Sequence, residues 1–175
     1  GLDRMTISLD SLDPETFARM SGSSLPLQTV LDGIDAAAAA GFSPLKLNAV
    51  VRRGMNDAEV IGLVDFARAG RHTLRLIEYM DVGTKNGWRM DDVVSGAELV
   101  AMINEAMPLD AIEPAYRGEV AKRGRYRDGS GDVGIITSVT QPFCGDCTRA
   151  RLTTNGHFVT CLFAAGGVDL KSPLR

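Results

Sequence analysis

Residues 45–79, LKLNAVVRRGMNDAEVIGLVDFARAGRHTLRLIEY, carry the pattern that decides the fold. Two short runs, rich in apolar and β-branched residues, flank a segment with helical periodicity. In order, they predict a strand at Leu45–Val51, a helix that Asn56 or Asp57 caps and that runs through Ala69, and a strand at Thr73–Tyr79. A strand, a helix and a strand in this order are typical of a parallel β/α unit.

The same alternation extends toward the beginning of the chain. Met5–Leu9 predicts a buried strand, and Pro14–Met20 and Leu27–Ala40 have helical character. Three such units favour an α/β fold, as part of a (β/α) barrel or an open doubly wound sheet, in which ligands bind at the carboxyl ends of the strands. The residues predicted there are Ser8, Asp10, Asn48, Arg52, Glu78 and Met80.

Regular alternation stops after Tyr79. The later segments are, in order, an irregular stretch at 83–90, a helix at 95–106, a strand at 109–112, a basic, Gly-rich loop or hairpin edge at 117–134, and β-structure at 134–140 and 150–154. Asn155-Gly156 lies between two β-like runs and predicts a two-residue hairpin turn. A smaller, β-rich region is therefore expected after the β/α units.

Composition and charge narrow the class of protein. The 175 residues have a formal net charge of -3, which argues against a nucleic-acid partner. No apolar run approaches the roughly 20 residues that span a bilayer, and no signal segment follows Gly1, so neither membrane nor export is expected. We expect a cytoplasmic protein, since an odd number of cysteines suits a reducing compartment. The basic residues of 117–127 suit attraction of an anionic ligand or plain solvation.

The three cysteines form the strongest chemical signal from residue spacing. Two residues separate Cys144 from Cys147, and the predicted hairpin can fold Cys161 back toward them. Three thiolates suit a [4Fe-4S] cluster with one iron lacking a cysteine, or a zinc site completed by a group such as His157. Spacing alone favours the two metals equally, and buried unligated thiols are a less frequent third reading.

The sequence around the cysteines, FCGDCTRARLTTNGHFVTCLF at 143–163, closely resembles the cluster motif of the MoaA family, the radical S-adenosylmethionine GTP 3′,8-cyclases of molybdenum-cofactor biosynthesis. MTISLDSLDPETF at 5–17, LKLNAVVRRGMN at 45–56, RLIEYMDVG at 75–83 and ITSVTQPFCGDC at 136–147 also look like that family, in the same order. Thr148 departs from the motif, because the family usually has asparagine there. The resemblance covers essentially the whole chain.

The resemblance implies a fold and a division of the chain. Residues 1–90 would be the C-terminal half of a partial (β/α) TIM-type barrel, and 91–175 a small β-rich extension that binds a cluster and GTP. It also implies site residues. These are Cys144, Cys147 and Cys161 for a second [4Fe-4S] cluster with an open iron for guanine, Lys46, Arg75, Arg149, Ala150 and Arg151 for GTP, and Ser8 and Met80 for S-adenosylmethionine.

Read without the resemblance, several of these residues have ordinary interpretations. Lys46 would be a solvated lysine on an edge strand, Ser8 a hydroxyl that opens a loop, and Met80 a core side chain. Arg149 and Arg151, expected on one face of a strand, would form a solvated basic surface. Further expectations are structural ion-pair roles for Glu78 and Asp10, and surface positions for His72 and His157.

By resemblance, the full-length protein is an enzyme that converts GTP to a cyclised pterin precursor by 5′-deoxyadenosyl radical chemistry. The Cys-x3-Cys-x2-Cys motif of the family's first cluster does not occur in these residues, so we expect no catalytic residue here and no activity from the chain alone. The expected partners are GTP, S-adenosylmethionine and, through the product, the next enzyme of the pathway, with a homodimer left open. Two alternatives are another radical enzyme with an auxiliary cluster and a non-catalytic zinc-ribbon module.

Overall fold

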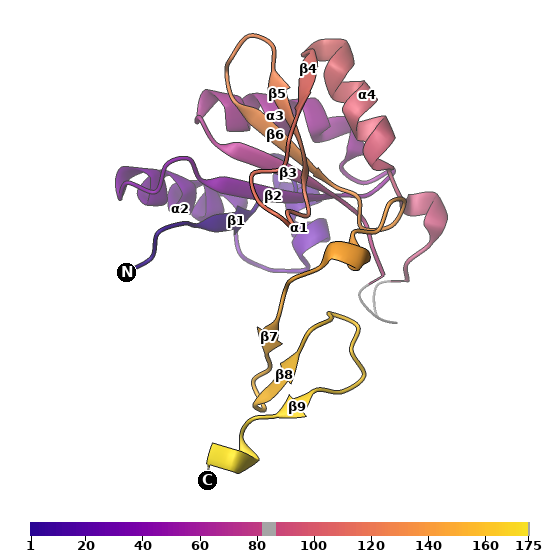
Figure 1. The fold of residues 1–175 in the computed structure, drawn as a ribbon. Coiled ribbons are helices and arrows are strands. Elements are labelled where there is room, and N and C mark those ends of the chain that lie inside the picture. Colours follow the sequence, from indigo (N-terminus) through magenta and orange to yellow (C-terminus); the bar gives the residue numbers. More distant parts are fainter. Residues whose placement is uncertain (82–86, 175) are drawn as a thin grey trace. The chain divides into compact units, whose positions relative to one another are not determined.

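The computed structural model describes residues 1–81 and 87–174 (Figure 1). The chain divides into two compact units, Gly1–Pro142 and Phe143–Arg175. The irregular stretch expected at 83–90 lies partly outside the described residues.

The first unit is built on one mixed sheet of six strands. In space the strands follow the order β1-β2-β3-β6-β5-β4. The first four in that order are parallel to one another, whereas β5 is antiparallel to both of its neighbours. The strands are β1 (Thr6–Ser8), β2 (Lys46–Val51), β3 (Thr73–Glu78), β4 (Leu109–Ile112), β5 (Lys122–Tyr126) and β6 (Asp132–Ile136).

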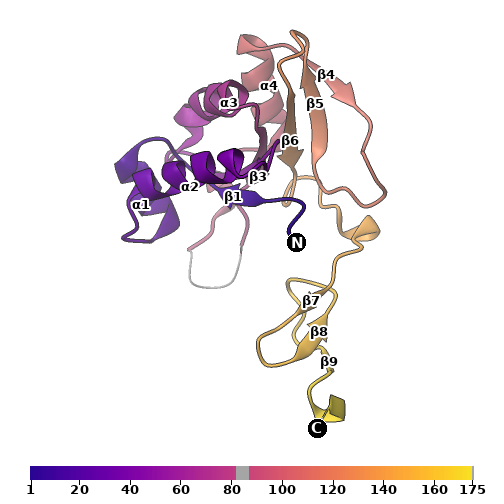
Figure 2. The same cartoon turned by 90° about the vertical axis from the view of Figure 1, so that its left-hand side faces the viewer.

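Four helices pack on one face of this sheet (Figure 2). They are α1 (Pro14–Ser21), α2 (Leu27–Ala39), α3 (Val60–Ala69) and α4 (Gly96–Ala106), with short 3-10 turns at Asp57–Glu59 and Met90–Asp92. Local capping chemistry sets two of the helix starts. The Asp13 side chain accepts a hydrogen bond from Thr16 N at 2.8 Å, and Ser95 with Glu98 forms a capping box.

Strict alternation along β2 separates the two faces of the sheet. Leu47, Ala49 and Val51 are fully buried and belong to the core with the helices, whereas Lys46 and Asn48 on the other face are only half-buried. Strand β3 repeats this pattern. The face away from the helices, called the open face below, therefore carries polar side chains.

Three expectations about the first unit are corrected. Strand β1 is not a buried strand, because it lies at the edge of the sheet and leaves Thr6 and Ser8 exposed. Lys46 is not on an edge strand, because β2 lies between β1 and β3. Asn56 is at the N-cap position of the 3-10 turn, but its side chain makes no capping hydrogen bond: the amide is fully buried, donates to Asp10 O at 2.6 Å and Val50 O at 2.8 Å, and accepts from Arg52 N at 2.9 Å.

The second unit is a small antiparallel sheet in the order β7-β8-β9. It consists of β7 (Arg151–Leu152), β8 (His157–Val159) and β9 (Val168–Asp169), with 3-10 turns at Cys144–Asp146 and Ser172–Leu174. None of its side chains with a described exposure is buried. A unit of this size without a core needs another source of stability, such as a metal centre or the rest of the protein.

The expected hairpin is present, but its turn differs from the prediction. Gly156 N donates to Thr153 O at 2.9 Å and Thr153 N to His157 O at 2.9 Å, so three residues form the loop. Gly156 alone in this loop has a positive φ, of 86°. The turn is thus the three-residue type in which a glycine in the left-handed region closes the hairpin, rather than a two-residue Asn-Gly turn.

The structure supports the fold class at the level of a mixed α/β protein with a parallel-rich sheet and a separate small antiparallel sheet. Whether the parallel strands belong to a closed barrel stays a prediction. The division expected between residues 90 and 91 also stays a prediction. In the structure, β6 from beyond that division pairs with β3 from before it, and both lie in the first compact unit.

Candidate functional site

One transverse row of residues crosses the open face of the first unit. Strand register places Ser8 beside Asn48, Asn48 beside Arg75, Arg75 beside Gly134, and Gly134 beside Arg123. Paired residues on neighbouring strands point to the same side of a sheet. The predicted S-adenosylmethionine residue Ser8 and the predicted GTP residue Arg75 therefore share a row, two strands apart.

Arg75 has defined contacts on both sides of this row. Its Nε donates to Asn48 Oδ1 at 2.9 Å, and its Nη2 lies 3.5 Å from Thr6 Oγ1. A Cβ atom at Gly134 would lie 3.1 Å from Arg75 Cγ, so the missing side chain makes room for the arginine stem. Spacing in the sequence gives no signal for the role of Gly134, because the residue is far from Arg75 along the chain.

Lys46 lies on the same face, one row away from Asn48. Burial lowers the pKa of its ammonium group, and the nearby positive charges of Arg75 and Arg4 lower it further. Among residues 1–81 and 87–174, no carboxylate lies within ion-pair distance of Lys46 or Arg75. Burial also lowers the pKa of Arg75, although Tyr116 and Glu119 act in the opposite direction. These cations are partly desolvated and repel one another, which favours binding of an anion.

The two residues predicted for S-adenosylmethionine lie at the carboxyl ends of two strands. Ser8 is the exposed last residue of β1, and Met80, which is half-buried, follows β3. Next to Met80, the Tyr79 ring has the Arg52 guanidinium 5.0 Å from its centroid, and Tyr79 O accepts a hydrogen bond from Trp88 Nε1 at 2.9 Å. The segment that carries Met80 is therefore tied to its surroundings.

Glu78, the last residue of β3, is a buried carboxylate whose role the sequence did not indicate. Its Oε1 accepts from Gly96 N at 2.7 Å and from the Thr140 hydroxyl, and its Oε2 accepts from Val139 N and Thr140 N, both at 2.8 Å. Burial raises the pKa of Glu78, but the hydrogen bonds together lower it below its usual value. The expected ion pair is wrong, because neither Glu78 nor Asp10 has an ion-pair partner among the described residues.

Glu78 joins three parts of the first unit. It connects the end of β3, the start of α4 and the turn at 138–141 that leads to the cysteines. Asp10 makes a simpler contact, as its Oδ1 accepts from Val50 N at 2.8 Å. Burial raises the pKa of Asp10, and this hydrogen bond partly offsets that effect.

All three cysteines belong to the second unit and are free thiols. Cys144 and Cys147 are the first residue of a 3-10 turn and the residue after it, and Cys161 follows β8. Cys147 Sγ accepts from Arg149 Nε at 3.4 Å, and the backbone and side chain of Arg149 lower the pKa of this thiol. A lowered pKa favours the thiolate, which is the form that binds metal.

The described part of the chain contains no group of three or more metal-binding side chains positioned to hold an ion. The thiols are therefore present in one small unit without a ready-made site. The three thiols can serve as sulfur ligands of an iron–sulfur cluster or of zinc, because all three are free and half-buried or exposed. His157, the alternative zinc ligand, and His72 are half-buried rather than exposed, and the Nδ1 atom of each is buried without a hydrogen-bond partner.

The Arg149-Ala150-Arg151 triplet differs from its predicted geometry. Only Arg151 lies on β7, where it pairs with Val159, and Arg149 precedes the strand. The Arg149 guanidinium lies 4.9 Å from the centroid of the Phe143 ring, and Ala150 is exposed. The expectation of two arginines on one strand face is therefore wrong, because β7 is too short to include both.

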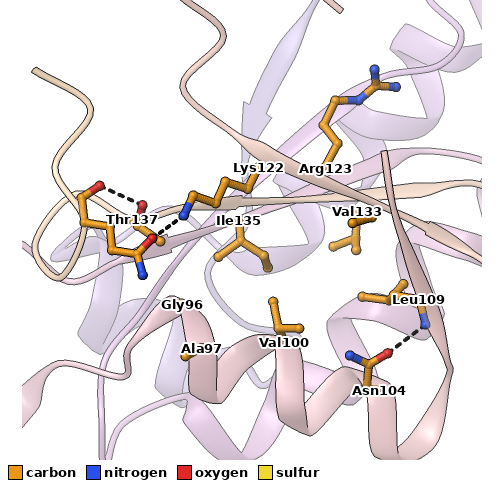
Figure 3. A pocket seen from close by; sticks show the side chains of 13 residues that line it. Gly96, Ala97, Val100, Asn104, Leu109, Lys122, Arg123, Val133, Ile135 and Thr137 are labelled. Atoms are coloured by element: carbon orange, nitrogen blue, oxygen red, sulfur yellow. Dashed lines mark hydrogen bonds between the residues drawn. The ribbon is translucent and has the colours of Figure 1, made fainter. Parts of the chain in front are cut away.

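A cavity of about 440 Å³ lies elsewhere, between α4 and strands β4 to β6 (Figure 3). Val100, Leu109, Val133 and Ile135 line it with apolar groups. Two of its polar groups are already hydrogen-bonded, because Asn104 Oδ1 accepts from Leu109 N and Lys122 donates to Gln141. Lys122 and Arg123 of the basic segment also line it, but none of the residues predicted for GTP, S-adenosylmethionine or a cluster does, so the open face is the better candidate site. In the described residues, no helix is long and apolar enough to cross a membrane.

Comparisons with known proteins place the chain among molybdenum-cofactor proteins. Residues 72–175 match the family Molybdenum Cofactor Synthesis C, and residues 1–67 match the Radical SAM superfamily. Proteins named GTP 3′,8-cyclase are similar to this chain over essentially its whole length. The one from Acidothermus cellulolyticus is 57% identical over 175 residues, which are 100% of this chain and 48% of that protein.

Two further relatives with the same name agree with this result. The protein from Xanthomonas axonopodis pv. citri is 51% identical over 99% of this chain and 52% of its own length, and that from Synechococcus sp. CC9605 is 49% identical over 99% and 53%. The chain spans about half the length of the curated relatives it matches. Because the match at residues 72–175 covers more than half of its length, this chain belongs to the Molybdenum Cofactor Synthesis C family.

Proposed function

We propose that this chain is the part of a GTP 3′,8-cyclase that holds the nucleotide substrate. Three relatives that carry this name are 49–57% identical to it over 99–100% of its length, which supports the proposal. The observation that carries it is the pair Lys46 and Arg75. Both cations lie on the open face, partly desolvated and without a carboxylate at ion-pair distance among the described residues.

The triphosphate is the part of GTP that these residues suit. Phosphate oxygens satisfy a guanidinium fork with two parallel hydrogen bonds and neutralise a lysine as a point charge. Binding would remove the repulsion between Lys46 and Arg75, which lowers the pKa of Lys46 in the free protein. For the second unit, we propose Arg149, Ala150 and Arg151 as GTP-binding residues.

For the fold, we propose that the four parallel strands are part of a (β/α) barrel. Strand β1 is the edge of the described sheet, so it has a free side for the strands that would complete a barrel. Ser8 and Met80 lie at the carboxyl ends of strands, where barrel enzymes bind ligands, and in this proposal they contact S-adenosylmethionine.

Cys144, Cys147 and Cys161 would hold a [4Fe-4S] cluster in the second unit. None of the side chains there with a described exposure is buried, which supports this assignment, because a small unit without a core needs a centre that binds its chain segments together. When bound, such a cluster supplies one iron without a cysteine, which can hold a heteroatom of guanine. The residue 161 segment must approach Cys144 and Cys147 for this, since the described residues form no ready metal site.

The longer protein would need a second cluster and S-adenosylmethionine for its radical chemistry, and we expect no turnover from this chain alone. We place it in the cytoplasm, where it would pass its product to the next enzyme of the pathway, and leave a homodimer open. Binding of GTP to the open face can be measured with this chain alone.

Calorimetric titration of the chain with GTP tests the triphosphate site. Lys46→Met and Arg75→Met are each expected to weaken binding by roughly tenfold or more, because each removes a charge-assisted contact. Arg19→Met is the matched control. It removes an exposed arginine in the last turn of α1, a helix that packs on the other face of the sheet, and GTP affinity should not change. Unchanged affinity in both Lys46→Met and Arg75→Met would refute the assignment.

Anaerobic reconstitution with iron and sulfide tests the cysteine site. Metal analysis and Mössbauer spectroscopy should show a [4Fe-4S] cluster whose spectrum changes when GTP is added. Replacing Cys161 by serine should prevent its assembly. Stoichiometric zinc without iron would instead support a zinc-ribbon module and contradict the cluster. A cluster whose spectrum does not change when GTP is added would indicate a radical enzyme that acts on a different substrate.

A further inference from the structure

Arg75 has fixed contacts at both its stem and its head, which is unusual for a side chain on the open side of a sheet. The stem passes over Gly134, where an added Cβ would lie 3.1 Å from Arg75 Cγ and 3.1 Å from Ala121 Cβ. The head is turned toward β2, where Nε donates to Asn48 Oδ1 at 2.9 Å. The guanidinium plane is thus oriented by its own strand neighbours in the absence of ligand.

We infer that Asn48 is a positioning residue, which aims the Arg75 guanidinium for binding of the nucleotide triphosphate. The inference rests on the proposed function, because it assumes that Arg75 binds phosphate. Asn48 need not touch the nucleotide itself. It acts on the ligand through the direction that it gives to Arg75.

The position of Asn48 in the sheet supports this role. Asparagine is disfavoured inside strands, yet Asn48 occupies the interior of β2, between β1 and β3. Its side chain is half-buried and directly opposite Arg75 in the register. A β-branched or apolar residue would suit the strand better, so the hydrogen bond to Arg75 is the property that asparagine adds.

The geometry leaves the outer part of the guanidinium for the ligand. Because Asn48 occupies Nε, the two terminal nitrogens remain, and the hydrogen bond of Nη2 to Thr6 Oγ1 is long, at 3.5 Å. Those two nitrogens can meet two phosphate oxygens together. Holding the fork in place beforehand reduces the rotamer freedom that is lost on binding, and so increases affinity.

A double-mutant cycle on the chain tests the inference. Asn48→Ala should weaken GTP binding roughly tenfold, the scale of one hydrogen bond to a charged group. In an Arg75→Met background the same change should have no further effect, because there is no guanidinium left to aim. Guanosine, which lacks phosphates, should bind Asn48→Ala as it binds the unmodified chain.

Two further variants make the result independent of misfolding and of unspecific effects. Asn48→Thr has a side chain that suits a strand but is too short to reach Nε, so it should repeat the loss even if Asn48→Ala folds poorly. Asn104→Ala, on α4 and away from the open face, is the control that should leave GTP affinity unchanged. Circular dichroism spectra establish that each variant is folded.

The outcomes separate this inference from the proposed function. If Arg75→Met weakens GTP binding but both Asn48 variants bind GTP normally, the positioning role is wrong and the triphosphate site stands. An equal loss from Asn48→Ala with and without Arg75 would also overturn it, because Asn48 would then act independently. If Arg75→Met itself leaves GTP affinity unchanged, the proposed function fails at this residue.

Discussion

Replacement of Glu78 provides the sharpest test of how the first unit is held together. Four hydrogen bonds converge on its carboxylate: two on Oε1, from Gly96 N and the Thr140 hydroxyl, and two on Oε2, from Val139 N and Thr140 N. Glutamine has the same shape but only one acceptor oxygen. Its best orientation keeps that oxygen at the Oε2 position and turns the amide nitrogen toward Gly96 N.

The magnitude follows from counting the donors that lose an acceptor. In Glu78→Gln the Thr140 hydroxyl can rotate and accept, so Gly96 N alone is left without a partner, which costs about 1–3 kcal/mol. Glu78→Ala leaves three backbone N–H groups without their acceptor, the buried one of Gly96 and the part-buried ones of Val139 and Thr140, and opens a cavity, so the loss should be larger, roughly 3–5 kcal/mol. The ranking Ala worse than Gln is the essential expectation.

Urea denaturation at neutral pH gives the free energy of unfolding for each variant. Glu105→Gln, at an exposed position of α4, is the control and should change stability by less than about 0.5 kcal/mol. The carboxylate has a lowered pKa in the folded protein, so its stabilisation is present above the ordinary value of 4.5 and is lost as the pH falls through the folded-state pKa. The difference between the unmodified chain and Glu78→Gln should therefore shrink in acid.

Equal stability of Glu78→Gln and the unmodified chain at neutral pH would refute the argument, since a buried N–H would then have lost its acceptor without cost. So would a difference that grows on acidification, because the lowered pKa requires the opposite sign.

Three other predictions follow from single residues. Asn56→Ala should lower the free energy of unfolding by about 3 kcal/mol in urea denaturation, because its buried amide satisfies three backbone groups. GTP binding should be accompanied by proton uptake at alkaline pH, because phosphate raises the lowered pKa of Lys46; calorimetry in buffers of different ionisation enthalpy should show this uptake, and Lys46→Met should abolish it. Burial raises the pKa of Tyr126 to about 12, so tyrosinate absorbance should show a step at about pH 12 that Tyr126→Phe removes.

Local patterns in the sequence predicted the elements of the first unit well. The strands expected at Leu45–Val51 and Thr73–Tyr79 occur as β2 and β3, with ends that differ by one residue. The helix expected at 95–106 occurs as α4, with Ser95 as its N-cap. Such elements depend on the alternation of apolar residues and on capping side chains, which are properties of neighbouring residues.

Predictions failed where a side chain has partners far away in the chain. Asn56 looks like a helix cap, yet its amide binds Asp10 O across the fold. Glu78 looks like half of an ion pair, yet backbone N–H groups from two later segments surround it. A helix-capping residue and a buried polar residue that hydrogen-bonds distant segments look alike in the sequence, since both are polar residues at the end of an element.

The sequence by itself determined most strands and helices of the first unit, the three thiols, and a resemblance specific enough to suggest a nucleotide substrate, but strand β5 lies within the predicted loop or hairpin edge at 117–134. Tertiary structure alone decided the sheet order, which inserts β6 between β3 and β5. That order brings Gly134 beside Arg75 and Arg123 beside Gly134, and so creates the row on the open face. The physical reason is that hydrophobic periodicity is a property of residues close together in the chain. Strand register and the orientation of the Arg75 guanidinium depend instead on which distant strands pair.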